Sequence, residues 1–154
     1  MLIQLALAVA LSVPVPLVPA PAALGPQEPD GWVWTLYENP RETVLAREVP
    51  DTDRLSATLT CTPGSSHITV NLYDHPAQAG FARFSSGGAS GTTELPATGT
   101  GGPFTLTLPV DHPATTNFVL SGRLEMSVGD QAHALRLPRD RLANLRRFTE
   151  ICSG

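Results

Sequence analysis

The sequence predicts an all-β domain: an antiparallel β-sandwich or barrel of about eight to ten short strands, with one C-terminal α-helix. Three observations lead to this fold class. Apolar and polar residues alternate on both sides of a Pro63-Gly64 turn between Leu55 and Tyr73, which is the period of a strand with one buried face. Further alternating runs recur along the chain, separated by short segments rich in Pro, Gly, Asn and Asp. A helical period over 139–151 follows the last of these runs.

Composition divides the chain into three parts. Residues 1–23 contain no charged side chain, and their longest apolar run is too short for a bilayer span of about 20 residues. Ala20-Pro21-Ala22 matches a cleavage site, which predicts a signal peptide over 1–23, cleaved after Ala22 or Ala23. An uncleaved anchor is the alternative, but the prolines before Ala22 would interrupt a spanning helix. We expect a flexible lead-in over 24–31 and a single domain over 32–154.

Export of this kind places the protein in the periplasm or outside the cell, with no stable transmembrane segment after cleavage. The chain has fourteen acidic residues and ten basic ones, a net charge of −4. Nucleic-acid binding normally needs a basic face. The mild acidity therefore argues against a nucleic-acid partner.

The chain contains two cysteines, and in an exported protein two cysteines most simply form one disulfide. Cys61 lies on the apolar face of the central hairpin, and Cys152 is the third residue from the end of the chain, beside the apolar stripe of the predicted helix. We therefore expect a Cys61–Cys152 disulfide that links helix to sheet. A free pair of thiols is the alternative, and the spacing is unlike that of a zinc site.

The remaining elements follow in order. Strands are expected over 32–37 and 43–48 before the central hairpin. After it they are expected over 80–85, 104–108, 124–128 and 132–137, and the last two are joined by a Gly129-Asp130 turn. The only helix expected runs over 139–151, where leucine, phenylalanine and isoleucine recur every three residues. Trp32 and Trp34 lie on one strand face and are expected to fill the core rather than to form a carbohydrate-binding platform.

Residues 85–103 are expected to form a long surface loop, with a brief strand near Thr92–Leu95. They include six of the thirteen glycines and almost no large apolar side chain. Loops of this length in a compact domain are usually functional or disordered, so the loop is the predicted binding region. The candidate binding residues are Ser85, Ser86, Gly87, Gly88, Ser90 and Gly91.

Two Asp-His-Pro-Ala segments are the other candidates for chemistry. They begin at Asp74 and Asp111, and two Asp-His pairs brought together could form a four-ligand metal site. Asp and Pro are also ordinary turn residues, and this second interpretation is favoured. Neither a serine-nucleophile motif nor a phosphate-binding motif occurs in the sequence, and the spacing of Glu94 and Glu125 gives no reason to pair them. We therefore predict no catalytic site, metal or cofactor.

An exported W-x-W strand (Trp32, Trp34), an L-x-C strand ending at Cys61 and a helix ending F-x-x-x-C (Phe148, Cys152) resemble a group of small periplasmic proteobacterial proteins. Accessory proteins of type VI secretion and proteins of the invasion-associated locus B kind belong to this group. The resemblance implies a β-sandwich with a non-enzymatic role at the cell envelope.

A second resemblance is to periplasmic inhibitors of c-type lysozyme, which are small disulfide-bonded β-barrels that present a Ser/Gly loop to the enzyme. Residues 85–91 could serve as that loop, but the aromatic residue expected soon after it is absent, since Thr92, Thr93 and Glu94 follow. The sequence thus predicts an exported binding or structural module that is not an enzyme and has an envelope protein as its partner. The alternative function is inhibition of a cell-wall hydrolase through the Ser/Gly loop.

Overall fold

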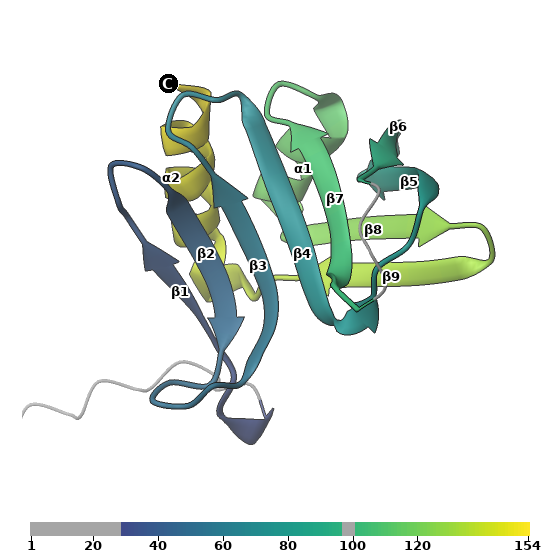
Figure 1. Cartoon of the computed structure of the whole chain (residues 1–154). Helices are drawn as coiled ribbons and strands as arrows, with labels where there is room; N and C mark the ends of the chain where they lie inside the picture. The colour runs from purple at the N-terminus through teal and green to yellow at the C-terminus, as the bar shows by residue number, and fades with distance from the viewer. Residues whose placement is uncertain (1–28, 97–100) are drawn as a thin grey trace, which may run out of the picture.

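The computed structural model describes residues 29–96 and 101–154, which form two antiparallel sheets and confirm the all-β fold class (Figure 1). The five-stranded sheet has the order β1-β2-β3-β4-β7, and the four-stranded sheet has the order β6-β5-β8-β9. The strands β8 and β9 run across the direction of β1 to β4 (Figure 1). The strands of the first sheet are β1 (Val33–Tyr37), β2 (Thr43–Glu48), β3 (Leu55–Cys61), β4 (His67–Pro76) and β7 (Pro103–Pro109); those of the second are β5 (Gly80–Ser86), β6 (Ala89–Leu95), β8 (Arg123–Val128) and β9 (Gln131–Arg136).

The predicted central hairpin is β3 and β4 with the Pro63-Gly64 turn between them, and Leu59 is paired with Val70. The predicted turn at Gly129-Asp130 is also confirmed, because β8 and β9 pair on either side of it. The strands before the central hairpin likewise lie where the alternating pattern places them. Local alternation and turn residues therefore locate most of the strands.

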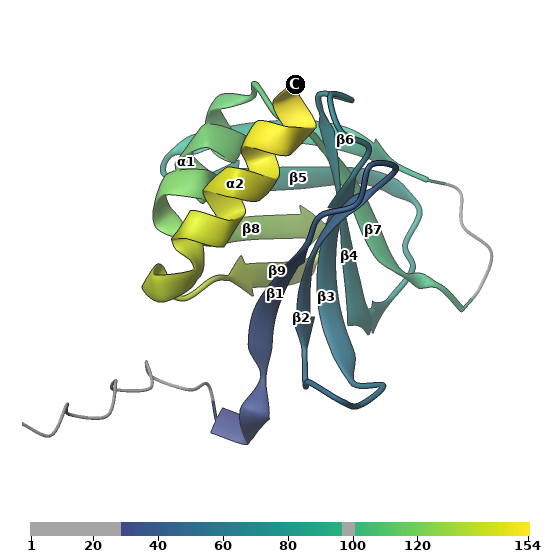
Figure 2. The same cartoon turned by 90° about the vertical axis from the view of Figure 1, so that its left-hand side faces the viewer.

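Two helices lie side by side on the same side of the molecule (Figure 2). The C-terminal helix α2 (Leu142–Ser153) is preceded by a short 3₁₀ turn, η2 (Arg139–Arg141), and it buries Leu145 and Phe148 as its periodicity predicts. The helix α1 (Pro113–Ser121) was not predicted. It begins at Pro113 after the N-cap His112 and ends at Gly122, whose φ is 71°. Proline in the first turn and glycine after the last are the usual ends of a helix.

A single core lies between the inner faces of the two sheets and beneath both helices. Trp34 is 2% exposed and belongs to it, as predicted. Trp32 differs from the prediction, because it precedes β1, is only half-buried, and has the guanidinium groups of Arg47 and Arg54 each 4.9 Å from a ring centroid. The largest fully buried side chains are Trp34, Phe84, Phe104, Phe118, Phe148, Leu45, Leu59, Ile68, Leu106, Leu108, Leu124 and Met126.

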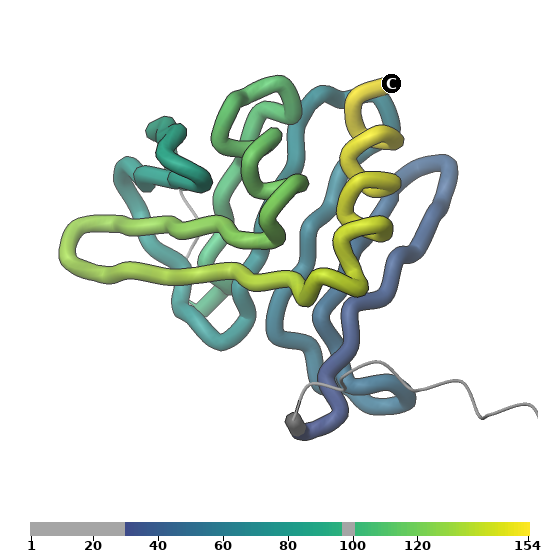
Figure 3. The backbone as a smooth tube through the Cα atoms, turned by 180° about the vertical axis from the view of Figure 1, so that it is seen from behind, coloured from purple at the N-terminus to yellow at the C-terminus, as the bar shows by residue number. Residues whose placement is uncertain are grey.

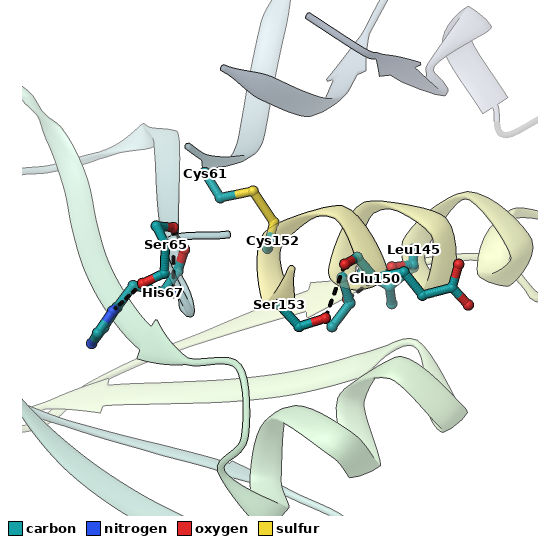
Figure 4. Close-up of a disulfide and its surroundings, with 8 residues drawn as sticks. Cys61, Ser65, His67, Leu145, Glu150, Cys152 and Ser153 are labelled. Carbon is teal, nitrogen blue, oxygen red and sulfur yellow. Dashed lines mark hydrogen bonds between the residues drawn. A yellow bond between two sulfur atoms is a disulfide. The ribbon is translucent and has the colours of Figure 1, made fainter. Parts of the chain in front are cut away.

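The predicted disulfide is present. Cys61 at the end of β3 is bonded to Cys152 in the last turn of α2, and their Cα atoms are 5.8 Å apart (Figure 4). Hydrogen bonds strengthen the same junction, since the amides of Gly64 and Ser66 donate to the carbonyls of Ile151 and Cys152, each at 2.9 Å. These carbonyls lie in the last turn of a helix, where they have no partner within the helix. The β3–β4 turn therefore caps the C-terminal end of α2.

The predicted signal peptide and most of the lead-in lie outside the described residues. Of the lead-in, Pro29–Gly31 forms a short 3₁₀ turn, η1, in which Asp30 has a φ of 77°. None of the helices in 29–96 and 101–154 is both long and apolar enough to cross a membrane.

Candidate functional site

The residues predicted to form a Ser/Gly loop form a tight β-hairpin instead. Over 85–95 the prediction of a loop is wrong, because β5 and β6 pair along this segment, Ser85 opposite Ser90 and Ser86 opposite Ala89. Gly87 and Gly88 make the two-residue turn with φ values of 55° and 86°. Two positive φ values are the requirement of a type I′ turn, which matches the twist of the strands it joins. The brief strand expected near Thr92–Leu95 is the second half of β6.

Two of the candidate binding residues have structural roles. Ser86 is 6% exposed, and its hydroxyl donates to the carbonyl of Arg123 at 2.7 Å, which ties β5 to the start of β8. Gly91 lies beneath the ring of Phe84, and a Cβ atom at this position would be 2.4 Å from Cζ of that ring. The glycine is needed so that the aromatic ring can cross the strand.

The hairpin turn is fixed from the other side by α1. Nδ2 of Asn117 donates to the carbonyls of Ser86 and Gly87 at 3.1 and 3.3 Å. A Cβ atom at Gly87 would be 2.9 Å from the amide group of Asn117, whereas Gly88 has open space around it. The turn is thus held in one position and presents Gly88 to solvent.

A hollow of about 460 Å³ opens beside this turn, on the outer face of the four-stranded sheet. We call it the hairpin hollow. Ser90 is exposed at its rim and accepts a hydrogen bond of 3.2 Å from Nη2 of Arg83. Its lining combines cationic, anionic and hydroxyl groups with the backbone of the turn: Arg83, Ser85, Ser86, Gly87, Gly88, Ala89, Ser90, Ser121, Arg123 and Glu125.

The two Asp-His-Pro-Ala segments have different roles, and their histidines do not meet. Nδ1 of His112 accepts a hydrogen bond of 3.1 Å from the amide of Ala114 and so caps α1, while its ring lies at the edge of Phe84, with centroids 4.9 Å apart. His75 lies near the end of β4, and its ring centroid is 4.2 Å from that of His133. Within the described part of the chain, no three His, Cys, Asp or Glu side chains gather as metal ligands would.

His133 was not recognised in the sequence. It is 8% exposed, packs against Phe104 with ring centroids 4.8 Å apart, and neither of its ring nitrogens has a hydrogen-bond partner. Burial lowers the pKa of His133 below its ordinary value, and the charge of His75 lowers it further. The sequence contains one signal for this position, because His133 alternates with Leu135 and Leu137, which both point inward.

The residues considered for catalysis do not form a catalytic arrangement. Ser90 lies within the strand β6 rather than in a strand-to-helix elbow. Glu94 of β6 lies opposite Phe81 of β5 in the sheet, and Glu125 of β8 lies opposite Ser85 of β5. The two glutamates therefore flank β5 on opposite sides, at positions four residues apart along it. That offset is roughly 13 Å along the strand, whereas paired glycosidase carboxylates are about 5 to 9.5 Å apart.

Comparison of the chain with protein-family models, with curated proteins and with solved structures finds no match. The resemblances to small periplasmic proteins and to lysozyme inhibitors therefore stay predictions.

Proposed function

We propose that the chain is an exported binding module of the cell envelope, which contacts a protein partner through the hairpin hollow. The observation that supports this most directly is a rigid turn beside charged side chains that have no charged partner. Arg83, Arg123 and Glu125 line the hollow, and none of them takes part in an ion pair within 29–96 and 101–154.

The rigidity of the hairpin favours binding because little order has to be gained when a partner arrives. The hydrogen bonds from Asn117 and Ser86 fix the turn in the free protein. A contact surface that is already ordered loses less conformational entropy on association and so binds more tightly. The charged groups around it would select a partner of complementary charge.

Export is supported by the disulfide and by the predicted signal peptide. Structural disulfides are typical of oxidising compartments such as the periplasm and are rare in the cytosol. The location and the non-enzymatic role are both part of the proposal.

The proposal is tested with Ser90→Tyr, which fills the rim of the hairpin hollow at an exposed strand position that accepts aromatic residues. Thr107→Tyr on the outer face of the five-stranded sheet is the matched control. Immobilised wild type and both variants are exposed to envelope extract, and the retained proteins are compared by quantitative mass spectrometry. We expect wild type and Thr107→Tyr to retain the same proteins and Ser90→Tyr to lose them.

Retention of the same proteins by Ser90→Tyr, with an unchanged melting temperature, would rule out the hairpin hollow as the contact. A c-type lysozyme assay with the same three proteins tests the alternative. Inhibition that only Ser90→Tyr abolishes would identify the partner as a cell-wall hydrolase.

A further inference from the structure

Three arginines gather in a second hollow, at the end of the four-stranded sheet where β9 passes into α2. Figure 3 shows the β8–β9 hairpin running across the molecule and leading into α2. The hollow has a volume of about 750 Å³, and we call it the arginine hollow. It is lined by Leu120, Ser121, Arg123, Arg136, Leu137, Pro138, Arg139 and Leu142.

The charges of the arginine hollow are all of one sign. Arg123 and Arg136 are directly opposite each other on β8 and β9, an arrangement that costs stability for like charges. Neither of them, nor Arg139, forms an ion pair with any residue that the structure describes. By contrast, Arg141 pairs with Asp140 and Arg147 with Glu38, at 3.3 and 3.1 Å.

No ion pair joins these arginines to the nearby carboxylates that the structure describes. Glu125, two residues after Arg123 on β8, lines the hairpin hollow together with it. Asp74 borders a neighbouring hollow together with Arg136, but no ion pair joins the two. Arg139 lies in the first turn of the helical segment that leads into α2, where the helix dipole disfavours a cation. Three arginines thus line one hollow in a chain whose net charge is −4.

The chain holds the arginines in place through Gly122. The amide of Leu137 donates to the carbonyl of Gly122 at 2.8 Å, which fixes the end of α1 against the link between β9 and α2. A Cβ atom at Gly122 would be 2.5 Å from the carbonyl oxygen of Leu137, so only glycine fits. Arg123 and Arg136 are the next residues to this contact in the sequence, so it fixes where their backbones lie relative to each other.

The same hollow has an apolar side. Leu120 on α1 is 61% exposed, although it is a large aliphatic residue. Leu142 in the first turn of α2 is only partly buried and also lines the hollow. An exposed leucine beside three arginines offers an apolar surface and a cationic surface to one ligand.

We propose that the arginine hollow binds an anionic amphiphile, a phosphate ester with an alkyl chain. The guanidinium groups would bind the phosphate, because their planar N–H donors match two phosphate oxygens at once. The alkyl chain would lie on Leu120 and Leu142 and be removed from water. The phosphate ester can come from a phospholipid in a membrane or from a free amphiphile. This ligand differs in kind from the protein partner of the hairpin hollow, although Ser121 and Arg123 line both hollows.

The test measures the binding of decyl phosphate and of inorganic phosphate by isothermal titration calorimetry. We expect decyl phosphate to bind the wild type and Arg136→Gln to weaken it roughly tenfold, the loss of one charge-assisted hydrogen bond. Leu120→Ser should weaken decyl phosphate and leave inorganic phosphate unchanged. Arg41→Gln removes the same charge from the exposed β1–β2 turn and is the matched control, with no effect expected.

A wild type that does not bind decyl phosphate, or an Arg136→Gln variant that binds it as tightly as the wild type, would overturn the proposal. An unfolding midpoint of Arg136→Gln at or above that of the wild type shows that weaker binding does not come from a damaged fold. Ser90→Tyr should bind decyl phosphate normally, so that failure here and failure at the hairpin hollow are distinguishable.

Co-sedimentation with vesicles separates the two sources of the phosphate. The vesicles are phosphatidylcholine with or without phosphatidylglycerol. Sedimentation of the wild type with the anionic vesicles, reduced in Arg136→Gln, supports a membrane lipid as the source. Binding of decyl phosphate without sedimentation supports an amphiphile taken up as a single molecule. Sedimentation that Arg136→Gln does not reduce contradicts a headgroup site at the arginine hollow.

Discussion

The outer faces of the two sheets use their polar side chains in opposite ways. On the five-stranded sheet they bond to one another. Asn71 donates to Thr58 at 3.1 Å and accepts from Thr105 at 2.9 Å, and the hydroxyls of Thr58 and Tyr73 are 3.4 Å apart. This network crosses β3, β4 and β7. Within this network the polar groups already have partners in the fold.

On the four-stranded sheet the corresponding face bears arginines that form no ion pair with any described residue. Arg83 has one hydrogen bond, to Ser90, and Arg123 and Arg136 are opposed as like charges. Side chains that cost stability and gain nothing from their neighbours are typical of functional sites. The first face therefore contributes to stability, whereas the second is the one at which we expect ligands to bind.

The largest effect on stability is expected from removal of the disulfide, which joins the five-stranded sheet to α2. Replacing Cys61 and Cys152 by Ala opens a link between residues 91 apart in the sequence. On the chain-entropy model this lowers the free energy of unfolding by about 4.6 kcal/mol. Urea denaturation measures the loss. The folded fraction should still bind decyl phosphate with wild-type affinity. A loss of affinity in this variant would contradict the view that the two sheets have separate roles.

The next effect is expected at Asn71, the centre of the network on the five-stranded sheet. Asn71→Ala leaves the buried hydroxyl of Thr58 and that of Thr105 without this partner, at a cost of about 1 to 2 kcal/mol. Thr107→Ala on the same face is the control, because none of the hydrogen bonds among the described side chains involves it. Chemical denaturation of both variants gives the difference. Equal stabilities for the two would mean that the network does not stabilise the sheet.

The sequence predicts the five-stranded sheet better than the four-stranded one, and the reason is physical. Leu59, Val70 and their neighbours alternate with threonines, so one face of each strand is apolar enough to be recognised. In β6 only Leu95 is a large apolar residue, and position 91 must be glycine because the ring of Phe84 lies against it. The composition of β6 is therefore that of a loop. The Gly87-Gly88 pair was the available hairpin signal.

The helix α1 and the two hollows could not be predicted in the same way. Thr115, Thr116 and Val119 are β-branched and favour strands, and the N-cap is a histidine, which is not among the preferred capping residues. The pairing of Arg123 with Arg136 depends on the register of β8 and β9, and Arg139 joins them only through the turn into α2. Tertiary structure brings these residues together.

The third effect appears only in acid and arises at the junction of the two sheets, where His133 of β9 faces His75 of β4 and Phe104 of β7. Burial and the charge of His75 lower the pKa of His133 from its ordinary 6.5. Below about pH 6.5 the unfolded chain binds a proton that the folded chain does not. The free energy of unfolding should therefore fall as the pH drops through 6.5 toward the lowered pKa.

His133→Leu removes this group and also the two ring nitrogens that have no hydrogen-bond partner. Melting temperatures measured from neutral to mildly acidic pH should decline less in this variant than in the wild type. His75→Gln should have a smaller effect of the same sign, because burial is the larger cause of the shift. Identical pH profiles for the wild type and His133→Leu would assign the acid sensitivity to other groups.

The smallest effect has the opposite sign and tests the comparison of the two faces most directly. Arg136→Gln removes the repulsion between directly opposed arginines, so the free energy of unfolding should rise by roughly 0.2 to 1 kcal/mol. The gain should shrink as salt screens the repulsion.

Because the chain has a net charge of −4, the loss of a positive charge anywhere slightly increases the overall repulsion. Arg41→Gln shares that general cost without the local relief, and the difference between the two variants isolates the pair. Urea denaturation at low and high salt gives both values. A stability of Arg136→Gln below that of Arg41→Gln would show that the fold itself uses Arg136, and the four-stranded sheet would then resemble the five-stranded one.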